Sequence, residues 1–313
     1  MTHARSSFLL FPTWAIAVVV FIWLILWLGA AQAFQREVGG ISYKRIPGID
    51  PGLTELDIYP VAQNKRAPVV VFVHGGSWHS GDKSNVQRAA SLRDFFERNG
   101  IVLVAINLRL VENPGSPGTT FRDQAADVAS AIRWVRDNIA EYGGDPGNIS
   151  LMGFSSGAHL AALVGTDDGY LRAEGLSPSS IKGIMAFDVD AYDIPRAIKE
   201  GSSYDWAPAA ENLPRVFSHD VGAQDDASPI RFVKSSKHYP PFLIIYSGVV
   251  KNGSQRLSQR QSELFADALK KAGVPVTVYG APEARHVELV MKLGRSDFGV
   301  TKAVQTFLDR YVK

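Results

Sequence analysis

A serine between two glycines is the first residue whose surroundings point to chemistry. Residues 153–157 read Gly-Phe-Ser-Ser-Gly, at the end of the apolar run 149–154 and directly before the helix-like run 158–163. A tight turn from a strand into a helix holds such a serine in a strained conformation that exposes its hydroxyl, and glycines on both sides let strand and helix approach closely. We therefore predict that Ser155 is the nucleophile of an acyl-transfer reaction.

The loop 74–78 supplies a second set of groups for the same chemistry. It reads His-Gly-Gly-Ser-Trp and follows the apolar run 69–73. Acyl transfer passes through a tetrahedral intermediate whose negative oxygen needs backbone N–H donors, and glycines let the backbone approach the substrate. The predicted oxyanion donors are the N–H groups of Gly76, Ser77 and Ser156. The predicted substrate contacts are His74, Gly75 and Trp78, the last as a wall of the acyl pocket.

The general base should be one of the seven histidines. In enzymes with this serine turn, the base follows the nucleophile along the chain. His159 is one helical turn beyond Ser155, which suits a supporting or core position, and His219 and His238 fall in an irregular region. His286 lies between the last strand-like run and the last helix-like run, so its loop can bring the imidazole over the serine. We predict His286 as the base.

Strand-like and helix-like segments alternate along the chain. Residues 54–59 alternate polar and apolar side chains, as half-buried strands do. Continuous runs of β-branched residues, typical of strands covered on both faces, lie at 69–73, 101–106, 149–154, 184–187, 242–246 and 274–279. Apolar residues at steps of four and three mark one face of a helix over 121–139. This alternation predicts an α/β fold with a mostly parallel, doubly wound sheet and helices on both faces.

Residues 192–239 form a long irregular region rich in Ser, Pro, Asp and Trp. Long segments without regular structure inside a compact domain usually serve as lids or insertions. We predict a single catalytic domain over residues 34–313, with residues 192–239 as a small cap or lid.

The composition excludes several other classes of protein. Lys and Arg number 33 and Asp and Glu 31, with no run of basic residues, so no nucleic-acid partner is predicted. The chain has no cysteine, which excludes disulfides, thiolate catalysis and cysteine metal sites. It contains no dinucleotide-binding glycine pattern, no phosphate-binding P-loop and no His-Glu-x-x-His motif. We therefore predict no metal and no cofactor.

Residues 1–33 have the pattern of an export segment. They contain one basic residue, Arg5, and no acid, and residues 8–28 are almost entirely apolar. Interpreted as a secretory signal peptide, the segment ends in the small-residue site 31–33 and is cut after Ala33. Interpreted as an uncleaved anchor, residues 8–28 are long enough to attach the chain to a membrane. In both cases we expect the rest of the chain to be exported, as a periplasmic, secreted or membrane-anchored protein.

The combined motifs resemble those of a known group of enzymes. Residues 74–83 are similar to the HGGxWxxGxK signature of α/β-hydrolase esterases of the ferulic acid esterase and kynurenine formamidase-like group. Residues 107–110, Asn-Leu-Arg-Leu, look like the Asn-Tyr-Arg-Leu of that group, and the likeness extends over roughly residues 54–310. The resemblance implies the α/β-hydrolase fold. It also implies the same nucleophile, base and oxyanion loop, namely Ser155, His286 and the loop around Gly76 and Ser77.

The resemblance further implies a catalytic acid in the loop 248–262, but this loop contains no Asp or Glu. A triad acid holds the imidazole in the correct tautomer, and replacing it with an amide can cost about 10⁴ in rate. One explanation is that the acid has moved to the end of the preceding strand, with Asp188 as the first candidate and Asp190 as the second. Another is a local contact from Glu283 to His286. The third is a site that works weakly, or not at all, as a Ser-His dyad. We favour the first explanation.

The leading expectation is a serine hydrolase that cleaves a small or aromatic carboxylic ester, a small-molecule substrate, through an acyl-enzyme intermediate. Aromatic residues near the predicted site favour such an acyl or alcohol group, namely Trp78, Tyr204 and Trp206. One alternative keeps the site but hydrolyses an amide, as an arylformamidase does. A second alternative is a non-catalytic protein of the same fold that binds a ligand or partner, and it depends on the missing acid.

Overall fold

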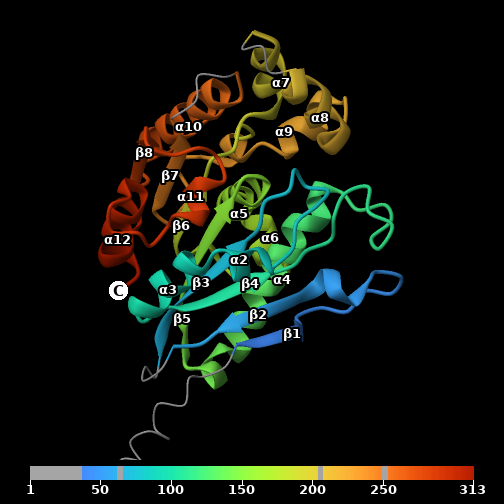
Figure 1. Ribbon diagram of the computed structural model, residues 1–313. Coiled ribbons are helices and arrows are strands. Elements are labelled where there is room, and N and C mark those ends of the chain that lie inside the picture. Colours follow the sequence, from blue (N-terminus) through green and yellow to red (C-terminus); the bar gives the residue numbers. More distant parts are fainter. Residues whose placement is uncertain (1–36, 62–65, 204–206, 249–252) are drawn as a thin grey trace, which may run out of the picture. The chain divides into compact units, whose positions relative to one another are not determined.

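The computed structural model describes residues 37–61, 66–203, 207–248 and 253–313. Its centre is a sheet of eight strands in the order β1-β2-β4-β3-β5-β6-β7-β8, which Figure 1 shows running from β1 at one end to β8 at the other. The strands are β1 (Val38–Ser42), β2 (Glu55–Tyr59), β3 (Ala67–Val73), β4 (Val102–Ile106), β5 (Gly144–Phe154), β6 (Ile181–Phe187), β7 (Phe242–Ser247) and β8 (Val276–Ala281). The pairs β1·β2 and β2·β4 are antiparallel, and all other neighbours are parallel. The predicted fold class, a mostly parallel α/β-hydrolase sheet, is confirmed.

Helices connect the parallel strands and cover both faces of the sheet. They are α2 (Asn85–Arg88), α3 (Ala90–Arg98), α4 (Phe121–Asn138), α5 (Ser156–Thr166), α6 (Asp168–Ala173), α7 (Ile194–Ser203), α8 (Ala207–Phe217), α9 (Val221–Asp226), α10 (Gly253–Lys271), α11 (Glu288–Met291) and α12 (Gly299–Tyr311). The face of α4 predicted from its apolar spacing is buried, since Phe121, Val128 and Ile132 are at most 2% exposed.

The central strands are apolar on both faces because two separate cores enclose them. In β3, Val69, Val71 and Val73 belong to one hydrophobic cluster with residues of α4, α5 and α10. The alternate side chains, Val70 and Phe72, belong to a second cluster with residues of α3 and α12. Successive side chains of a strand point to opposite faces, so a strand inside two cores needs a continuous apolar run.

The direction of the parallel strands also determines where the predicted functional groups lie. Strands β3, β5, β6 and β8 run in one direction, so their carboxyl ends lie along one edge of the sheet. The loop 74–78, Ser155 and Asp188 directly follow three of these ends, and His286 lies in the turns after the fourth. In open α/β sheets, ligands bind at this edge.

Residues 192–239 differ from the irregular region predicted from the sequence. They contain α7, α8, α9 and a short 3-10 helix (Pro229–Phe232), and helices α7 to α9 gather at the top of Figure 1. The many Ser, Pro and Asp residues are typical of loops, but here several of them occupy helix caps and helix starts. Asp220, for example, caps α9 with its side chain. The prediction of an irregular structure was wrong, and the role of this region as a cap stays a prediction.

Strand β1 was not predicted from the sequence, because the Gly39-Gly40 pair weakens the strand pattern.

The predicted export segment 1–33 lies outside the described residues. Within the described ranges, none of the helices has both the length and the apolar character that a membrane crossing requires.

Candidate functional site

Ser155 occupies the strained turn that its sequence context predicts. It lies between β5 and α5 with φ 55° and ψ −125°, a combination that side-chain-bearing residues rarely adopt. Its N–H donates to the carbonyl of Phe187 at 2.8 Å, which holds the turn against β6. A β-carbon on Gly153 would lie 2.2 Å from the carbonyl oxygen of Gly157, and one on Gly157 would lie 2.2 Å from that of Val73. Both glycines are therefore required for the close approach of strand and helix.

His286 and Asp188 meet at the same edge of the sheet. Nδ1 of His286 lies 2.8 Å from Oδ2 of Asp188, although 98 residues separate them in the chain. The ring of His286 also contacts Phe154, the residue before Ser155, with ring centroids 4.6 Å apart. The carboxylate is 3% exposed and the imidazole 43% exposed. One side of the imidazole is therefore anchored to a buried anion while the rest of the ring reaches the surface beside the serine turn.

Two further donors hold the Asp188 carboxylate in place. Oδ1 accepts hydrogen bonds from Oγ of Ser258 in α10 at 2.5 Å and from the N–H of Ser247 at the end of β7 at 3.2 Å. Burial by itself raises the pKa of Asp188, but the contacts to His286, Ser247 and Ser258 outweigh it and leave the pKa below its usual value. Asp188 is thus an anion at neutral pH. Its backbone, with φ 54°, is in the left-handed region, as is that of Ser155.

The loop 74–78 lies against the serine turn. A β-carbon on Gly75 would lie 2.8 Å from Cβ of Ser155, so only glycine allows this approach. Gly76 has φ 139°, Ser77 φ 52° and Trp78 φ 67°, and this run of unusual conformations turns the loop back on itself. Within the described residues, the N–H groups of Gly76, Ser77 and Ser156 donate to no other protein atom. Three backbone donors therefore remain available beside Ser155.

Polar side chains from other segments tie this loop down. The amide of Asn107 accepts from the N–H of Lys83 at 2.6 Å and donates to Asp82 at 2.8 Å, which fastens the end of the segment 74–83. Gln124 of α4 donates to the carbonyl oxygens of both Trp78, at 2.7 Å, and Arg109, at 2.8 Å. These contacts explain why the Asn-Leu-Arg-Leu segment occurs together with the glycine-rich loop.

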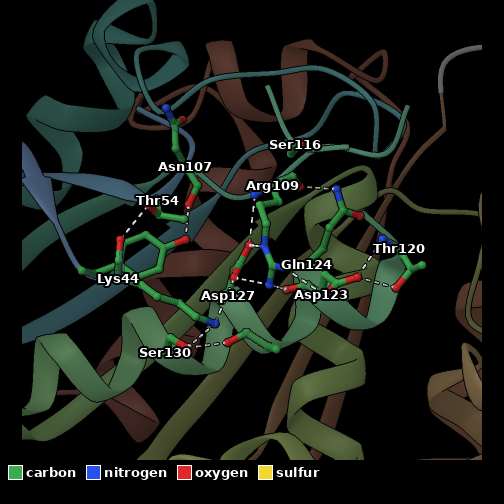
Figure 2. Close-up of polar contacts among 12 residues, drawn as sticks. Lys44, Thr54, Asn107, Arg109, Ser116, Thr120, Asp123, Gln124, Asp127 and Ser130 are labelled. Atoms are coloured by element: carbon green, nitrogen blue, oxygen red, sulfur yellow. Dashed lines mark hydrogen bonds and ion pairs between the residues drawn. The ribbon is translucent and has the colours of Figure 1, made fainter. Parts of the chain in front are cut away.

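A buried ion pair supports the same arrangement. The guanidinium of Arg109 donates to both carboxylate oxygens of Asp127 at 2.8 Å, and Figure 2 shows it pointing from the segment after β4 toward α4. It also donates to Asp123 at 3.0 Å. A fork-like pair of this kind gives geometric specificity as well as attraction, so it fixes the segment that contacts Trp78.

Trp78 has a different environment from the one predicted. It is 7% exposed, and its indole N–H donates to Nδ1 of His159 at 3.2 Å. The indole also packs edge-on against Phe217 of α8, with ring centroids 4.9 Å apart. Nε2 of His159 then donates to the carbonyl of Ala227 at 2.7 Å. The indole and imidazole therefore link the loop 74–78 and α5 to the segment 192–239, in keeping with the supporting position predicted for His159.

A pocket of about 340 Å³ opens beside the serine turn. Its residues include neighbours of two of the three predicted catalytic groups: Gly75 faces Ser155, Phe154 precedes Ser155 and Val287 follows His286. Trp78 is not among its lining residues, whereas the other two predicted substrate contacts are. The pocket is lined by Phe72, His74, Gly75, Asn85, Arg88, Phe154, Val287, Val290 and Met291.

Comparison with known proteins places this chain in a family. Residues 56–269 match the family model described as BD-FAE. The chain belongs to the BD-FAE family. This family consists of α/β-hydrolase esterases, as the sequence resemblance implied.

Two relatives of this BD-FAE chain span most of its length. It is 33% identical to the esterase LipQ of Mycobacterium tuberculosis over 286 residues. This alignment covers 90% of this chain and 64% of LipQ. It is 40% identical to the probable isoprenylcysteine alpha-carbonyl methylesterase ICMEL1 of Oryza sativa over 250 residues. That alignment covers 76% of this chain and 55% of ICMEL1. The BD-FAE chain therefore spans less than two thirds of the length of either relative.

Solved structures of esterases share the fold. Esterase B of Lactobacillus rhamnosis superimposes with a TM-score of 0.69 at 21% identity over 94% of both chains. The esterase Est2 of Thermogutta terrifontis gives a TM-score of 0.64 at 26% identity, with 89% of this chain and 93% of that one covered.

The structure gives the positions considered for the acid different surroundings. Asp188, and not Asp190, is the residue in contact with His286. Glu283, the local alternative, instead accepts a hydrogen bond from the hydroxyl of Tyr279 at 3.1 Å. Residues 249–252, within the loop where the resemblance implied an acid, lie outside the described residues, as do Tyr204 and Trp206.

The sequence did not single out three residues that support the BD-FAE site: Ser247, Ser258 and Gln124. For Ser258 and Gln124, the sequence pattern around the residue could have indicated a buried polar group. Ser258 follows the apolar Leu257 in α10, both residues are buried, and a buried hydroxyl needs a partner. Gln124 likewise follows Phe121 on the predicted buried face of α4. Ser247 contributes only its backbone N–H, which no side-chain pattern can reveal.

The buried His159 should make stability depend on pH. Burial lowers its pKa to about 4, whereas an exposed histidine has a pKa of about 6.5. Between these values the unfolded chain binds a proton that the folded chain does not, so the free energy of unfolding should fall as the pH falls. We expect His159 to contribute a loss of about 3 kcal/mol from pH 6.5 to pH 4. Urea denaturation across this range measures it.

The control for this prediction is His159→Gln, which can still donate to the carbonyl of Ala227 but does not titrate. Burial also lowers the pKa of His74, and that contribution is common to both proteins. The variant should therefore show a smaller pH dependence than the original chain. Equal pH dependence in the two proteins would contradict the prediction.

Proposed function

We propose that this chain hydrolyses carboxylic esters as a serine hydrolase with Ser155, His286 and Asp188 as its catalytic triad. One observation carries the proposal: the buried Asp188 carboxylate contacts Nδ1 of His286 at 2.8 Å, and the imidazole packs on the residue next to a strained, glycine-flanked serine. A serine, a base beside it and a third group that orients the base are the three parts of this chemistry. The names of the relatives, which are esterases, support the same class of reaction.

The first half of the reaction forms an acyl-enzyme. Oγ of Ser155 attacks the ester carbonyl carbon while Nε2 of His286 takes the hydroxyl proton, and the carbonyl π electrons move to the oxygen. The N–H groups of Gly76, Ser77 and Ser156 stabilise that oxyanion. As the intermediate collapses, the bond to the alcohol oxygen breaks and His286 gives its proton to the leaving alcohol. Asp188 keeps the Nδ1 proton in place and stabilises the imidazolium throughout.

The second half regenerates the enzyme. Water attacks the acyl carbonyl, and His286 takes a proton from the water and returns it to Oγ of Ser155, which releases the carboxylic acid. The same oxyanion donors act again. The pocket of about 340 Å³, lined mainly by apolar side chains, would hold a small or aromatic acyl or alcohol group.

The structure argues against one of the two alternatives raised by the sequence and does not distinguish the other from ester hydrolysis. The non-catalytic alternative depended on a missing acid, and the contact between Asp188 and His286 argues against it. The amide alternative uses the same triad and oxyanion donors, so the rates for matched ester and amide substrates must be compared to separate it from ester hydrolysis. Export of the chain stays a prediction, because residues 1–33 lie outside the described part.

Hydrolysis of para-nitrophenyl acetate by the full chain tests the proposal. We expect turnover and covalent labelling of Ser155 by a para-nitrophenyl alkylphosphonate, with one phosphonyl group per chain by mass spectrometry. Para-nitroacetanilide, the matched amide, should react far more slowly. A folded protein that neither turns over simple esters nor accepts the phosphonyl group would contradict the proposal, and faster hydrolysis of the anilide would favour the amide alternative.

A further inference from the structure

The pocket beside Ser155 changes in character from its inner to its outer end. Phe72 and Val290 are 2% and 7% exposed, so the inner end is almost closed to solvent. Val287 and Met291 are 58% and 42% exposed, and Arg88 at the end of α2 is exposed as well. A ligand in this pocket would bury an apolar body while one end of it stays near water.

Among the described residues that line this pocket, Arg88 is the one with a permanent charge. Within the described part of the chain, no carboxylate or carbonyl oxygen accepts a hydrogen bond from its guanidinium, whereas other surface arginines such as Arg133 and Arg295 are paired with aspartates. The part of the pocket lining that the structure describes also contains no Asp or Glu. A guanidinium without a protein partner, on the edge of an apolar pocket, favours a carboxylate or another planar anionic group.

A polar atom at the inner end also suits a bound ligand. Nδ1 of His74 lies 2.9 Å from the carbonyl oxygen of Gly75, so it carries the hydrogen and Nε2 is an acceptor. His74 is 3% exposed, and Nε2 has no partner among the described residues. A buried acceptor without a partner is unfavourable, and a hydrogen-bond donor on a ligand would relieve it. The neutral imidazole does not compete with Arg88 for an anion.

From this arrangement we infer that the natural substrate is an ester with an apolar body and a terminal anionic group, held in this pocket with the anion on Arg88. The inference rests on the proposed function and narrows its substrate class. The anionic group can belong to the acyl part or to the alcohol part of the ester, since both extend from the carbon that Ser155 attacks.

Two pairs of substrates test the inference and distinguish these parts. The acyl pair is mono-para-nitrophenyl adipate and para-nitrophenyl hexanoate, and the alcohol pair is meta-carboxyphenyl acetate and phenyl acetate. We expect Arg88→Gln to lower kcat/KM about fivefold to tenfold for the anionic member of one pair, with its neutral member changed by less than about twofold. Added salt should reduce this difference, because the site is open to solvent.

Arg45→Gln is the matched control, since Arg45 is exposed, does not line the pocket and undergoes the same change of charge. It should leave all four kcat/KM values within about twofold of those of the original chain. Equal effects of Arg88→Gln on anionic and neutral esters, or no effect on any of them, would overturn the inference while leaving ester hydrolysis intact. Failure of the original chain to hydrolyse even the neutral esters would instead overturn the proposed function together with the inference.

Discussion

Replacing Ser155 with alanine should lower kcat for para-nitrophenyl acetate by about 10⁶-fold, the size of effect seen when a triad serine is removed. The alanine has no oxygen to form the acyl-enzyme, so only the oxyanion donors and substrate binding remain to accelerate reaction with water. Steady-state kinetics with highly purified protein measures the loss. The fold should survive, because the change removes one atom from a half-buried position.

Ser156→Ala is the matched control for this variant. Its side chain hydroxyl has no assigned role, and the backbone N–H that we place in the oxyanion hole is retained in the alanine variant. We expect its kcat to stay within a few fold of the original value. A loss in Ser156→Ala comparable to that in Ser155→Ala would show that the strained turn, and not the nucleophile, had been disturbed.

Replacing Asp188 with asparagine should lower kcat by about 10⁴-fold. The asparagine can still accept from Ser258 and Ser247 through its oxygen, which leaves its NH₂ group facing Nδ1 of His286. Two donors cannot face each other, so the imidazole must place its proton on Nε2, where it can no longer accept the proton of Ser155. The same kinetic assay, with thermal denaturation to check folding, measures the effect.

Asp190→Asn separates this role from a general loss of negative charge. Asp190 is two residues further along and is not the residue in contact with His286, so we expect less than a tenfold change in kcat. If Asp190→Asn causes the larger loss, the assignment of Asp188 as the acid is wrong.

Several elements could be read directly from the sequence because their patterns are local. Strands enclosed by two cores are apolar on both faces, and the continuous apolar runs of β3 and β4 show this. The face of α4 follows from its spacing alone. The serine turn can also be recognised locally, because Gly153, Ser155 and Gly157 lie within five residues of one another. The close contact that requires glycine at position 157, however, is with Val73 of β3.

Other features depend on contacts that the sequence does not display. The helices α7 to α9 contain many residues typical of loops, and burial of residues such as Ile194 and Phe217 against the rest of the domain stabilises them. The motif of the loop 74–78 predicted Trp78 as a wall of the acyl pocket. Its orientation toward His159 and Phe217, however, arises from packing with α5 and α8.

The amino-acid sequence alone predicted the parts of the chemistry that we propose: a serine nucleophile, a histidine base and an oxyanion loop at the carboxyl ends of parallel strands. Each of these is specified by a short motif or by its order along the chain. The contact between Asp188 and His286, by contrast, became visible only in the folded chain. The choice between Asp188 and Asp190 depends on where β6 ends and on the side to which each side chain turns. The N–H of Ser247 at the end of β7 and the hydroxyl of Ser258 in α10 hold the Asp188 carboxylate, and no local pattern in the chain records these contacts.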